Sequence, residues 1–529
     1  MKKLFTLLVA CTLVVSSMAE FVPVSGQAQQ KLDAISQEIN DFLEQNPAVQ
    51  QFLDNLNTGV TKGPGGDVSL PAYMTPEEQE INRQIRSVKG ITKGSRKPSG
   101  SFMAPAEYDP TEGIFLGWPN SSHSTLQGQI AKAISDKYKV FIITQNESMV
   151  RSALSSAGAK MDNIQLLSAP LEALWVRDYG PWWIHTQSGN REIIDLKYYY
   201  NRPNDDAVPK RIGAWFNFPV HDSGFETEGG NIILDGHGVA IVGDVLISGN
   251  DSTSGSGYSA SQVKQYMRDY FGCNKTIILD SLDQAGGTGH IDIFAKLLDD
   301  RTIIVGQHSG PDGGYRGNYQ RMEDAARILA QETNGKGEKF NVVRIPMPDE
   351  RKSTFTYTNS LIINDKALVP TYTGMSSTSW NNGINDRALQ VYRDCMPGTT
   401  VYGIDCTRII YQGGCIHCIT KDMIAEQMKI TYKQPKSIRG GRSIPLNLEV
   451  RSNTPVNDAS VCVFWSTIRN GNYQQVQLEG TDGNYTGSIP AQEVGTQVFY
   501  YFAAEDVEGA YKTLPDNAPD AELFSATIQ

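Results

Sequence analysis

Hydrophobic residues in the middle of the chain fall into paired short runs, and a polar turn separates the two runs of each pair. The turns contain dipeptides such as Asp235-Gly236 and Asn364-Asp365, which are typical of β-hairpins when they lie between β-branched runs. We therefore expect four hairpins, at residues 182–196, 231–244, 294–307 and 361–372. They begin roughly 50 to 70 residues apart, a spacing that indicates a radial array of repeated units. Helical periodicity over 261–270 and 319–332 predicts helices between some of the hairpins.

The N-terminal part follows a different pattern. Apolar residues within 32–43 recur at helical spacing and predict a helix over 27–57, with an interruption at Pro47. A Gly/Pro-rich break at 63–66 follows. The charged stretch at 74–98 is expected to be a linker or a pro-segment, or else a stalk or packing arm.

The C-terminal part changes character again after Tyr432. Apolar and polar residues alternate, as in 444–450 and 497–503, and turn dipeptides such as Asp482-Gly483 separate the runs. Short alternating strands with regular turns over about ninety residues are typical of an immunoglobulin-like sandwich.

Residues 1–19 have the three parts of a secretory signal peptide. Basic residues follow Met1, an apolar run comes next, and small residues precede Ala19. The apolar run is too short to span a membrane. We expect cleavage after Ala19 and export to the periplasm, the cell surface or the medium. Residues 8–11 also resemble a lipobox that would place a lipid on Cys11, but apolar residues continue past Cys11, which favours ordinary cleavage.

Charge and cysteine content narrow the functional classes. The chain has 47 basic and 58 acidic side chains, a net charge of −11, which argues against nucleic acid as a partner. This charge suits a cationic substrate, although many soluble proteins are equally acidic. An oxidising compartment permits disulfides, and Cys395 and Cys406 form the favoured pair because they flank a predicted turn and strand.

Candidate chemistry is concentrated in three segments, 175–181, 289–292 and 413–420. A thiol, Cys418, with an imidazole elsewhere in the chain, His290, is the pattern of a cysteine nucleophile with its acid–base partner. Asp292 lies two residues after His290, so on a strand both side chains would face the same side. The alternative reading is a buried apolar cysteine and a solvated His–Asp pair.

The candidate site residues also occur at equivalent positions of the hairpin repeat. Asp178, Glu228, His290 and Asn359 each precede the first strand of a hairpin by a few residues. In a radial array, equivalent positions of successive units converge on the axis. We therefore expect these residues, which are far apart in the chain, to share one pocket with Cys418.

These motifs resemble the guanidine-modifying deiminases: agmatine deiminase and, more closely, the bacterial peptidylarginine deiminase of the Porphyromonas type. The resemblance implies a five-bladed, pseudo-symmetric α/β propeller. It implies that Cys418 attacks the guanidinium carbon, that Asp178 and Asp292 hold its nitrogens, and that His290 transfers protons. No metal or organic cofactor is needed for this chemistry. The bacterial peptidylarginine deiminase also carries an immunoglobulin-like domain after its catalytic one.

The resemblance assigns substrate contacts as well. Trp175 is expected to cover the face of the cation, and Asn359 to bind substrate at the same phase of the repeat. Glu228, in a Glu-Gly-Gly motif, is expected to orient His290, and this acid favours agmatine deiminase because the Porphyromonas-type enzyme lacks it. Arg202 lies in a segment that resembles the one binding the carboxylate of a C-terminal arginine. That enzyme uses two arginines two residues apart, and only Arg202 is present here.

The sequence therefore predicts an exported α/β deiminase that converts arginine, peptidyl or free, to citrulline and ammonia. We expect a signal peptide at 1–19, a helical N-terminal segment and linker at 20–100, a catalytic propeller at 101–432 and a sandwich at 433–529. Two alternatives stay open. One is an agmatine deiminase, and the other is a surface binding protein that has lost catalysis.

Overall fold

A computed structural model describes most of the chain. The described residues are 21–58, 69–89, 97–247, 257–283, 287–315, 317–351, 354–435, 438–469, 471–507, 509–516, 518–520 and 522–529. The expected signal peptide with Cys11, and the break at 63–66, lie outside these residues. None of the helices within them has the length and apolar character needed to cross a membrane.

Four of the sheets between residues 102 and 405 contain the expected hairpins, and each hairpin is an antiparallel pair. Local turn chemistry explains this result, because Asn364 adopts the left-handed conformation that the tight turn at 363–366 requires. The four hairpin predictions are therefore confirmed. The paired strands are β5 Trp182–Thr186 with β6 Arg191–Lys197, β8 Ile232–Leu234 with β9 Val239–Gly243, β11 Ala295–Leu297 with β12 Thr302–Gln307, and β14 Leu361–Ile363 with β15 Lys366–Thr371.

After each hairpin the chain forms a helix and then a strand that pairs in parallel with the second hairpin strand. The helices predicted at 261–270 and 319–332 are two of these. The helix and strand that follow each hairpin are α8 Val208–Phe216 and β7 Val220–Glu226, α9 Ala260–Phe271 and β10 Lys275–Leu279, α10 Asn318–Leu329 and β13 Asn341–Pro346, and α11 Ile384–Cys395 and β16 Thr400–Asp405. A helix between parallel strands covers one face of the sheet.

The fifth sheet joins the two ends of this region. The late strand β17 Thr420–Ile424 pairs antiparallel with the early strand β2 Thr111–Gly117, and two parallel strands extend the sheet. The extending elements are α4 Ser124–Ser135, β3 Lys139–Thr144, α5 Glu147–Ala157 and β4 Ile164–Ser168, and the short strand β1 Phe102–Met103 pairs with β5. The region is thus a mixed α/β fold in which a similar strand–strand–helix–strand unit recurs.

The C-terminal part consists of two antiparallel sheets that bury a common apolar cluster, which includes Leu446 and Phe502. Its first strand, β18, lies inside the range expected for the catalytic region, yet it pairs with β19. This part therefore begins by Met428. The strands are β18 Met428–Tyr432, β19 Ile444–Ser452, β20 Cys462–Ser466, β21 Gln474–Gln477, β22 Glu479–Thr481, β23 Asn484–Ile489, β24 Gln497–Glu505, β25 Tyr511–Leu514 and β26 Phe524–Thr527.

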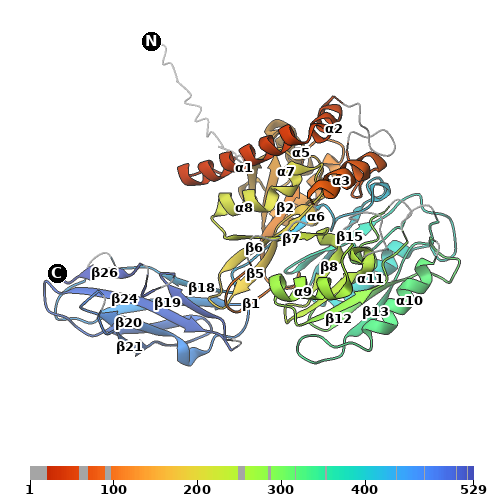
Figure 1. Cartoon of the computed structure of the whole chain (residues 1–529). Coiled ribbons are helices and arrows are strands. Elements are labelled where there is room, and N and C mark those ends of the chain that lie inside the picture. The colour runs from red at the N-terminus through yellow and green to blue at the C-terminus, as the bar shows by residue number, and fades with distance from the viewer. Residues whose placement is uncertain are drawn as a thin grey trace, which may run out of the picture.

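Three N-terminal helices lie against the α/β region (Figure 1). The expected helix at 27–57 is two helices, α1 Gly26–Gln45 and α2 Pro47–Asn57, and Pro47 starts the second. Residues 76–89, expected to be linker or pro-segment, form helix α3 Pro76–Lys89. Asn82 and Glu78 on this helix are buried, so this part of the expected linker is packed against the fold.

The six cysteines of the described residues are all free thiols. The expected disulfide between Cys395 and Cys406 is therefore wrong. Cys395 ends α11 and is partly exposed, whereas Cys406 is buried after β16, where its thiol interacts with that of Cys415.

Candidate active site

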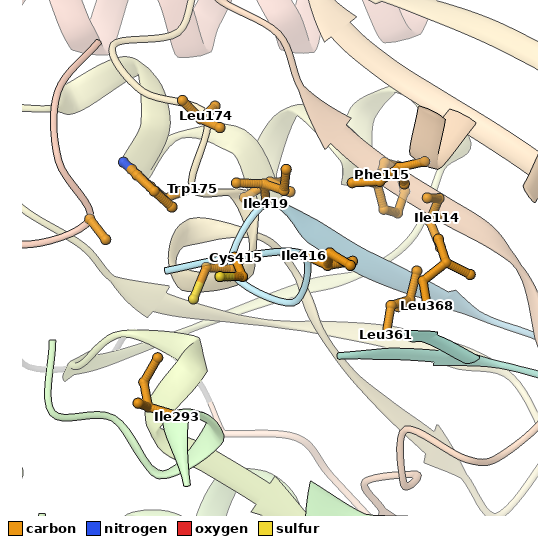
Figure 2. Packing of buried hydrophobic residues seen from close by; sticks show 14 of the residues in the cluster. Ile114, Phe115, Leu174, Trp175, Ile293, Leu361, Leu368, Cys415, Ile416 and Ile419 are labelled. Atoms are coloured by element: carbon orange, nitrogen blue, oxygen red, sulfur yellow. The ribbon is translucent and has the colours of Figure 1, made fainter. Parts of the chain in front are cut away.

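The segment that carries the thiol runs from Gly413 to Ile419 and leads into β17. Gly413 has a φ of 108°, a conformation that favours glycine. At Gly414, an added Cβ would lie 2.5 Å from the Sγ atom of Cys418, so only glycine fits beside the thiol. Figure 2 shows Cys415, Ile416 and Ile419 of this segment surrounded by apolar side chains. Cys418 is fully buried.

Asn359, immediately before β14, holds the thiol segment in place. Its Oδ1 atom accepts hydrogen bonds from the backbone N–H groups of Cys415 (2.9 Å) and Cys418 (3.4 Å). Its Nδ2 atom donates to the Sγ atom of Cys418 (3.1 Å) and to Oδ2 of Asp292 (2.9 Å). The amide therefore fixes the thiol and a carboxylate relative to each other.

His290 lies between two carboxylates. Its Nδ1 atom is 3.7 Å from Oδ1 of Asp178, and its Nε2 atom is 3.6 Å from Oε2 of Glu228. Asp178 is on the short helix α6 Val176–Tyr179 and accepts a 3.0 Å hydrogen bond from the N–H of Gly230. The expectation that His290 and Asp292 lie on a strand is wrong, because Ile291–Ile293 form a 3-10 turn.

Gly230 marks the point where the acid–base residues meet. An added Cβ there would lie 2.7 Å from Nδ1 of His290 and 3.0 Å from both Oδ1 of Asp178 and Oδ2 of Asp292. Asp292 Oδ2 is itself 3.7 Å from the Sγ atom of Cys418. The structure therefore brings together the thiol, imidazole and carboxylates that the sequence spreads over 240 residues, from 178 to 418.

Electrostatics assign protonation states to this cluster. Burial lowers the pKa of His290, but the carboxylates of Asp178 and Glu228 outweigh burial and raise it to about 9. Burial raises the pKa of Asp178 to about 7, with His290 opposing the change. Burial and the two aspartates also raise the pKa of the Cys418 thiol well above its usual range. Near neutral pH the empty site thus holds an imidazolium and a neutral thiol.

Several polar atoms of the cluster lack hydrogen-bond partners among the described residues. They are Oδ2 of Asp178, Oδ1 of Asp292, Oε2 of Glu228 and both ring nitrogens of His290. An unpaired buried polar group costs about 1–3 kcal/mol, and more when it is charged. The unpaired oxygens of Asp178 and Asp292 lie beside the thiol and form a site complementary to a cation with several N–H donors, whereas Oε2 of Glu228 faces Nε2 of His290 at 3.6 Å.

A second set of residues was not predicted. The ring of His417 bridges Oδ2 of Asp292 (2.6 Å) and Oε2 of Glu107 (2.8 Å). Glu107 in turn accepts a 2.5 Å bond from the ammonium of Lys296. Tyr199 donates to Oε1 of Glu228 (2.6 Å). Only the adjacency of His417 to the thiol could have indicated its role, since Glu107 lies 310 positions away.

Trp175 and Arg202 are buried at the edge of the cluster. The ring of Trp175 lies 3.3 Å from the position of an added Cβ on Gly414, and Figure 2 shows Trp175 near Ile419 and Cys415. The guanidinium of Arg202 is centred 5.0 Å from the ring of Tyr199 and pairs with the carboxylate of Glu78 at 2.7 Å. The guanidinium of Arg202 is therefore already paired with a carboxylate of the same chain. The expected role of Arg202 in binding the substrate stays a prediction.

Comparison with known proteins agrees with this chemistry. Residues 103–423 match the family described as Porphyromonas-type peptidyl-arginine deiminase. A protein of Vibrio parahaemolyticus named "Putative agmatine deiminase" is 24% identical over 61% of this chain and 97% of its own length. One of the same name from Selenomonas ruminantium is 22% identical over 63% of this chain and 99% of its own.

Solved structures share the fold. The structure of a Porphyromonas gingivalis protein named "Putative Arginine Deiminase" has a TM-score of 0.53 at 22% identity, over 62% of this chain and 99% of that one. The agmatine deiminase of Enterococcus faecalis has a TM-score of 0.51 at 21% identity, over 63% of this chain and 100% of that one.

Proposed function

Because the chain belongs to the Porphyromonas-type peptidyl-arginine deiminase family, we propose that it converts arginine, at a peptide C-terminus or free, to citrulline and ammonia. The enzyme is a hydrolase that acts on the carbon–nitrogen bonds of guanidines. The observation that carries the proposal is the pair of unpaired carboxylate oxygens on Asp178 and Asp292 beside the thiol of Cys418. A guanidinium supplies the N–H donors that these oxygens lack.

Substrate binding explains how the thiol becomes reactive. Burial, together with Asp292 and Asp178, raises the pKa of the Cys418 thiol, which keeps it neutral before substrate binds. A bound guanidinium brings one positive charge close to both carboxylates and the sulfur, which offsets part of the negative charge there, so the thiol pKa falls. The nucleophile is then formed where the substrate is present.

The reaction proceeds through a covalent intermediate. The Cys418 thiol releases its proton to water when the guanidinium is bound, and the resulting thiolate attacks the guanidinium carbon to form a carbon–sulfur bond. Protonated His290 gives its proton to the departing nitrogen, the carbon–nitrogen bond breaks and ammonia leaves. Neutral His290 then takes a proton from water, whose oxygen attacks the carbon. The carbon–sulfur bond breaks, which leaves a ureido group and restores the thiolate.

Agmatine deiminase is the second candidate. Glu228 favours it, as do the names of the Vibrio and Selenomonas relatives. Arg202 favours an arginine substrate instead, because a guanidinium at this place attracts a carboxylate and repels the ammonium group of agmatine.

The architecture and location complete the proposal. The recurring strand–strand–helix–strand units support a five-bladed propeller that ends before β18, and the two antiparallel sheets that share a core support an immunoglobulin-like domain that begins by Met428. The pattern of residues 1–19 supports export.

Steady-state ammonia release from three substrates tests the proposal. We expect a peptide ending in arginine, or free arginine, to be processed about tenfold better than agmatine, since one charge-assisted contact distinguishes them. The variant Cys418→Ser is the blank for each substrate. A preference for agmatine would make the chain an agmatine deiminase, and ammonia from none of the three would refute deiminase activity.

A further inference from the structure

Residues 69–89 form a continuous segment that packs against the candidate active site through its buried side chains. An extended stretch at 69–74 leads into helix α3, and we call the two together the cover. Leu70, Ala72 and Met74 of the stretch are almost fully buried. On α3, Glu78 and Asn82 have no exposed surface, although both are polar. Polar side chains are buried to this extent only when they are paired, so the cover is a specific contact.

The backbone of the cover binds the walls of the site. The carbonyl of Leu70 accepts a 2.8 Å bond from the indole of Trp175, and the carbonyl of Ala72 accepts a 3.3 Å bond from Tyr199. The N–H of Ala72 donates to the carbonyl of Gln412 at 2.8 Å. These three wall residues belong to different segments, and Gln412 immediately precedes the thiol segment.

Both wall side chains, Tyr199 and Trp175, adjoin the candidate catalytic residues. Tyr199 donates to Glu228, which faces His290. Trp175 lies beside Gly414, which touches Cys418. At Gly413, an added Cβ would lie 3.1 Å from Cβ of Ala72, so the cover packs closely on the thiol segment. The cover therefore closes the side of the site formed by Trp175, Tyr199 and residues 412–414.

Glu78 binds Arg202 as a substrate carboxylate would. One carboxylate oxygen accepts from Nε of Arg202 at 2.7 Å and the other from Nη2 at 3.1 Å, which is the two-point geometry preferred by guanidinium and carboxylate. Asn201 also donates to Glu78 at 2.7 Å. The same carboxylate caps its own helix by accepting from the N–H of Thr75. Neither Glu78 nor Arg202 has exposed side-chain surface.

The cover is an addition to the family's catalytic region. The family match begins at residue 103, after the cover. The relatives are matched over 97% or more of their own lengths by about three fifths of this chain. The shared region contains Cys418, His290 and the three acids, so the catalytic set is complete without the cover.

We propose that the cover is a built-in inhibitor of the site. This inference rests on the proposed function, and specifically on a substrate that brings a carboxylate to Arg202. Glu78 occupies Arg202 in the closed state, and 69–74 blocks the adjoining wall. Because the cover is tethered, it competes as if present at about millimolar concentration, and substrate must displace it. Loss of the Glu78 charge leaves Arg202 buried and unpaired in the closed state only, which favours opening.

The test compares Glu78→Gln with the matched control Glu80→Gln, on the same helix. Glu80 is exposed and pairs only with neighbours on α3, including Arg83. Two readouts are measured on the full chain: kcat/KM for a peptide ending in arginine, and the rate at which iodoacetamide alkylates Cys418, read by fragmentation of the peptide that contains it. We expect Glu78→Gln to raise both by about tenfold and Glu80→Gln to match wild type.

The two readouts separate the two hypotheses. If Glu78→Gln accelerates alkylation of Cys418 but no guanidine substrate yields ammonia, the proposal that the cover blocks the site is supported and the proposed deiminase function is refuted. If wild type releases ammonia and Glu78→Gln leaves both rates unchanged or lowered, the inhibitor proposal is overturned. Should Glu78→Gln lack a cooperative melting transition, Arg86→Gln replaces it. Arg86 anchors the other end of α3 to Glu226 at 2.9 Å, and the same increases are expected.

Discussion

Glu228→Gln offers a sharp test of how the site sets its protonation states. Catalysis needs Asp178 ionised, to hold the guanidinium, and His290 protonated, to release ammonia. With pKa values of about 7 and about 9, kcat/KM should rise as pH increases through about 7 and fall as pH increases through about 9. The acid limb (the rise) and the alkaline limb (the fall) of this pH profile belong to the coupled pair Asp178 and His290 rather than to either residue alone.

The carboxylate of Glu228 contributes to both limbs. It lies 3.6 Å from Nε2 of His290, which corresponds to about 4–5 kcal/mol at an effective dielectric constant of about 20. One pKa unit is about 1.4 kcal/mol, and a glutamine amide can still accept from the imidazole, so we expect the alkaline limb to move down by about one to two units. Glu228 also raises the pKa of Asp178, so the acid limb should move down as well.

The assay is ammonia release across pH 5 to about 10 at low substrate concentration. Glu192→Gln is the control, because it removes the same charge from a partly exposed carboxylate that pairs with His221 away from the site. Limbs of Glu228→Gln that coincide with those of wild type, or an alkaline limb that moves upward, would refute the assigned protonation states.

Further substitutions test individual contacts. Asp178→Asn and Asp292→Asn should each raise KM and lower kcat, with a loss of about 10- to 100-fold in kcat/KM, and near-normal kinetics would remove that residue from the site. Cys415→Ser should retain substantial ammonia release, whereas an inactive Cys415→Ser beside an active Cys418→Ser would reverse the nucleophile assignment. His417→Ala removes a charge-assisted bond to Asp292 and should lower kcat/KM by about tenfold or more, while unchanged kinetics would make the bridge to Glu107 irrelevant to catalysis. Arg177→Ala leaves buried Asp422 without its 2.8 Å partner and should lower the free energy of unfolding in urea by about 3–5 kcal/mol. Arg83→Ala removes one partner of an exposed pair and is the control; it should unfold close to wild type, and equal losses would contradict the burial argument.

The hairpins could be predicted because their determinants are local. β-branched runs and a turn dipeptide such as Asn364-Asp365 specify an antiparallel pair without help from distant residues. The repeated phase of Asp178, Glu228, His290 and Asn359 also indicates a shared pocket from the sequence alone.

Specific contacts between residues that lie far apart in the chain could not be predicted from the sequence. The bridge from His417 to Glu107 joins residues 310 positions apart, and no local pattern specifies it. Residues 76–89 looked like a linker because most of their side chains are polar, yet Glu78 and Asn82 are buried by partners near residue 201. His290 and Asp292 were placed on a strand by their spacing, but Gly289, with a φ of 70°, starts a tight turn instead.

The covalent step at Cys418 is the central claim, and acid quenching during turnover tests it most directly. Wild-type enzyme is mixed with a peptide ending in arginine, quenched within milliseconds and digested, and the peptide that contains Cys415 and Cys418 is fragmented by mass spectrometry. The account predicts a substrate-derived amidino adduct on the sulfur of Cys418, which appears during turnover and is absent from Cys418→Ser. An adduct on Cys415, or turnover of the same substrate by Cys418→Ser, would contradict it.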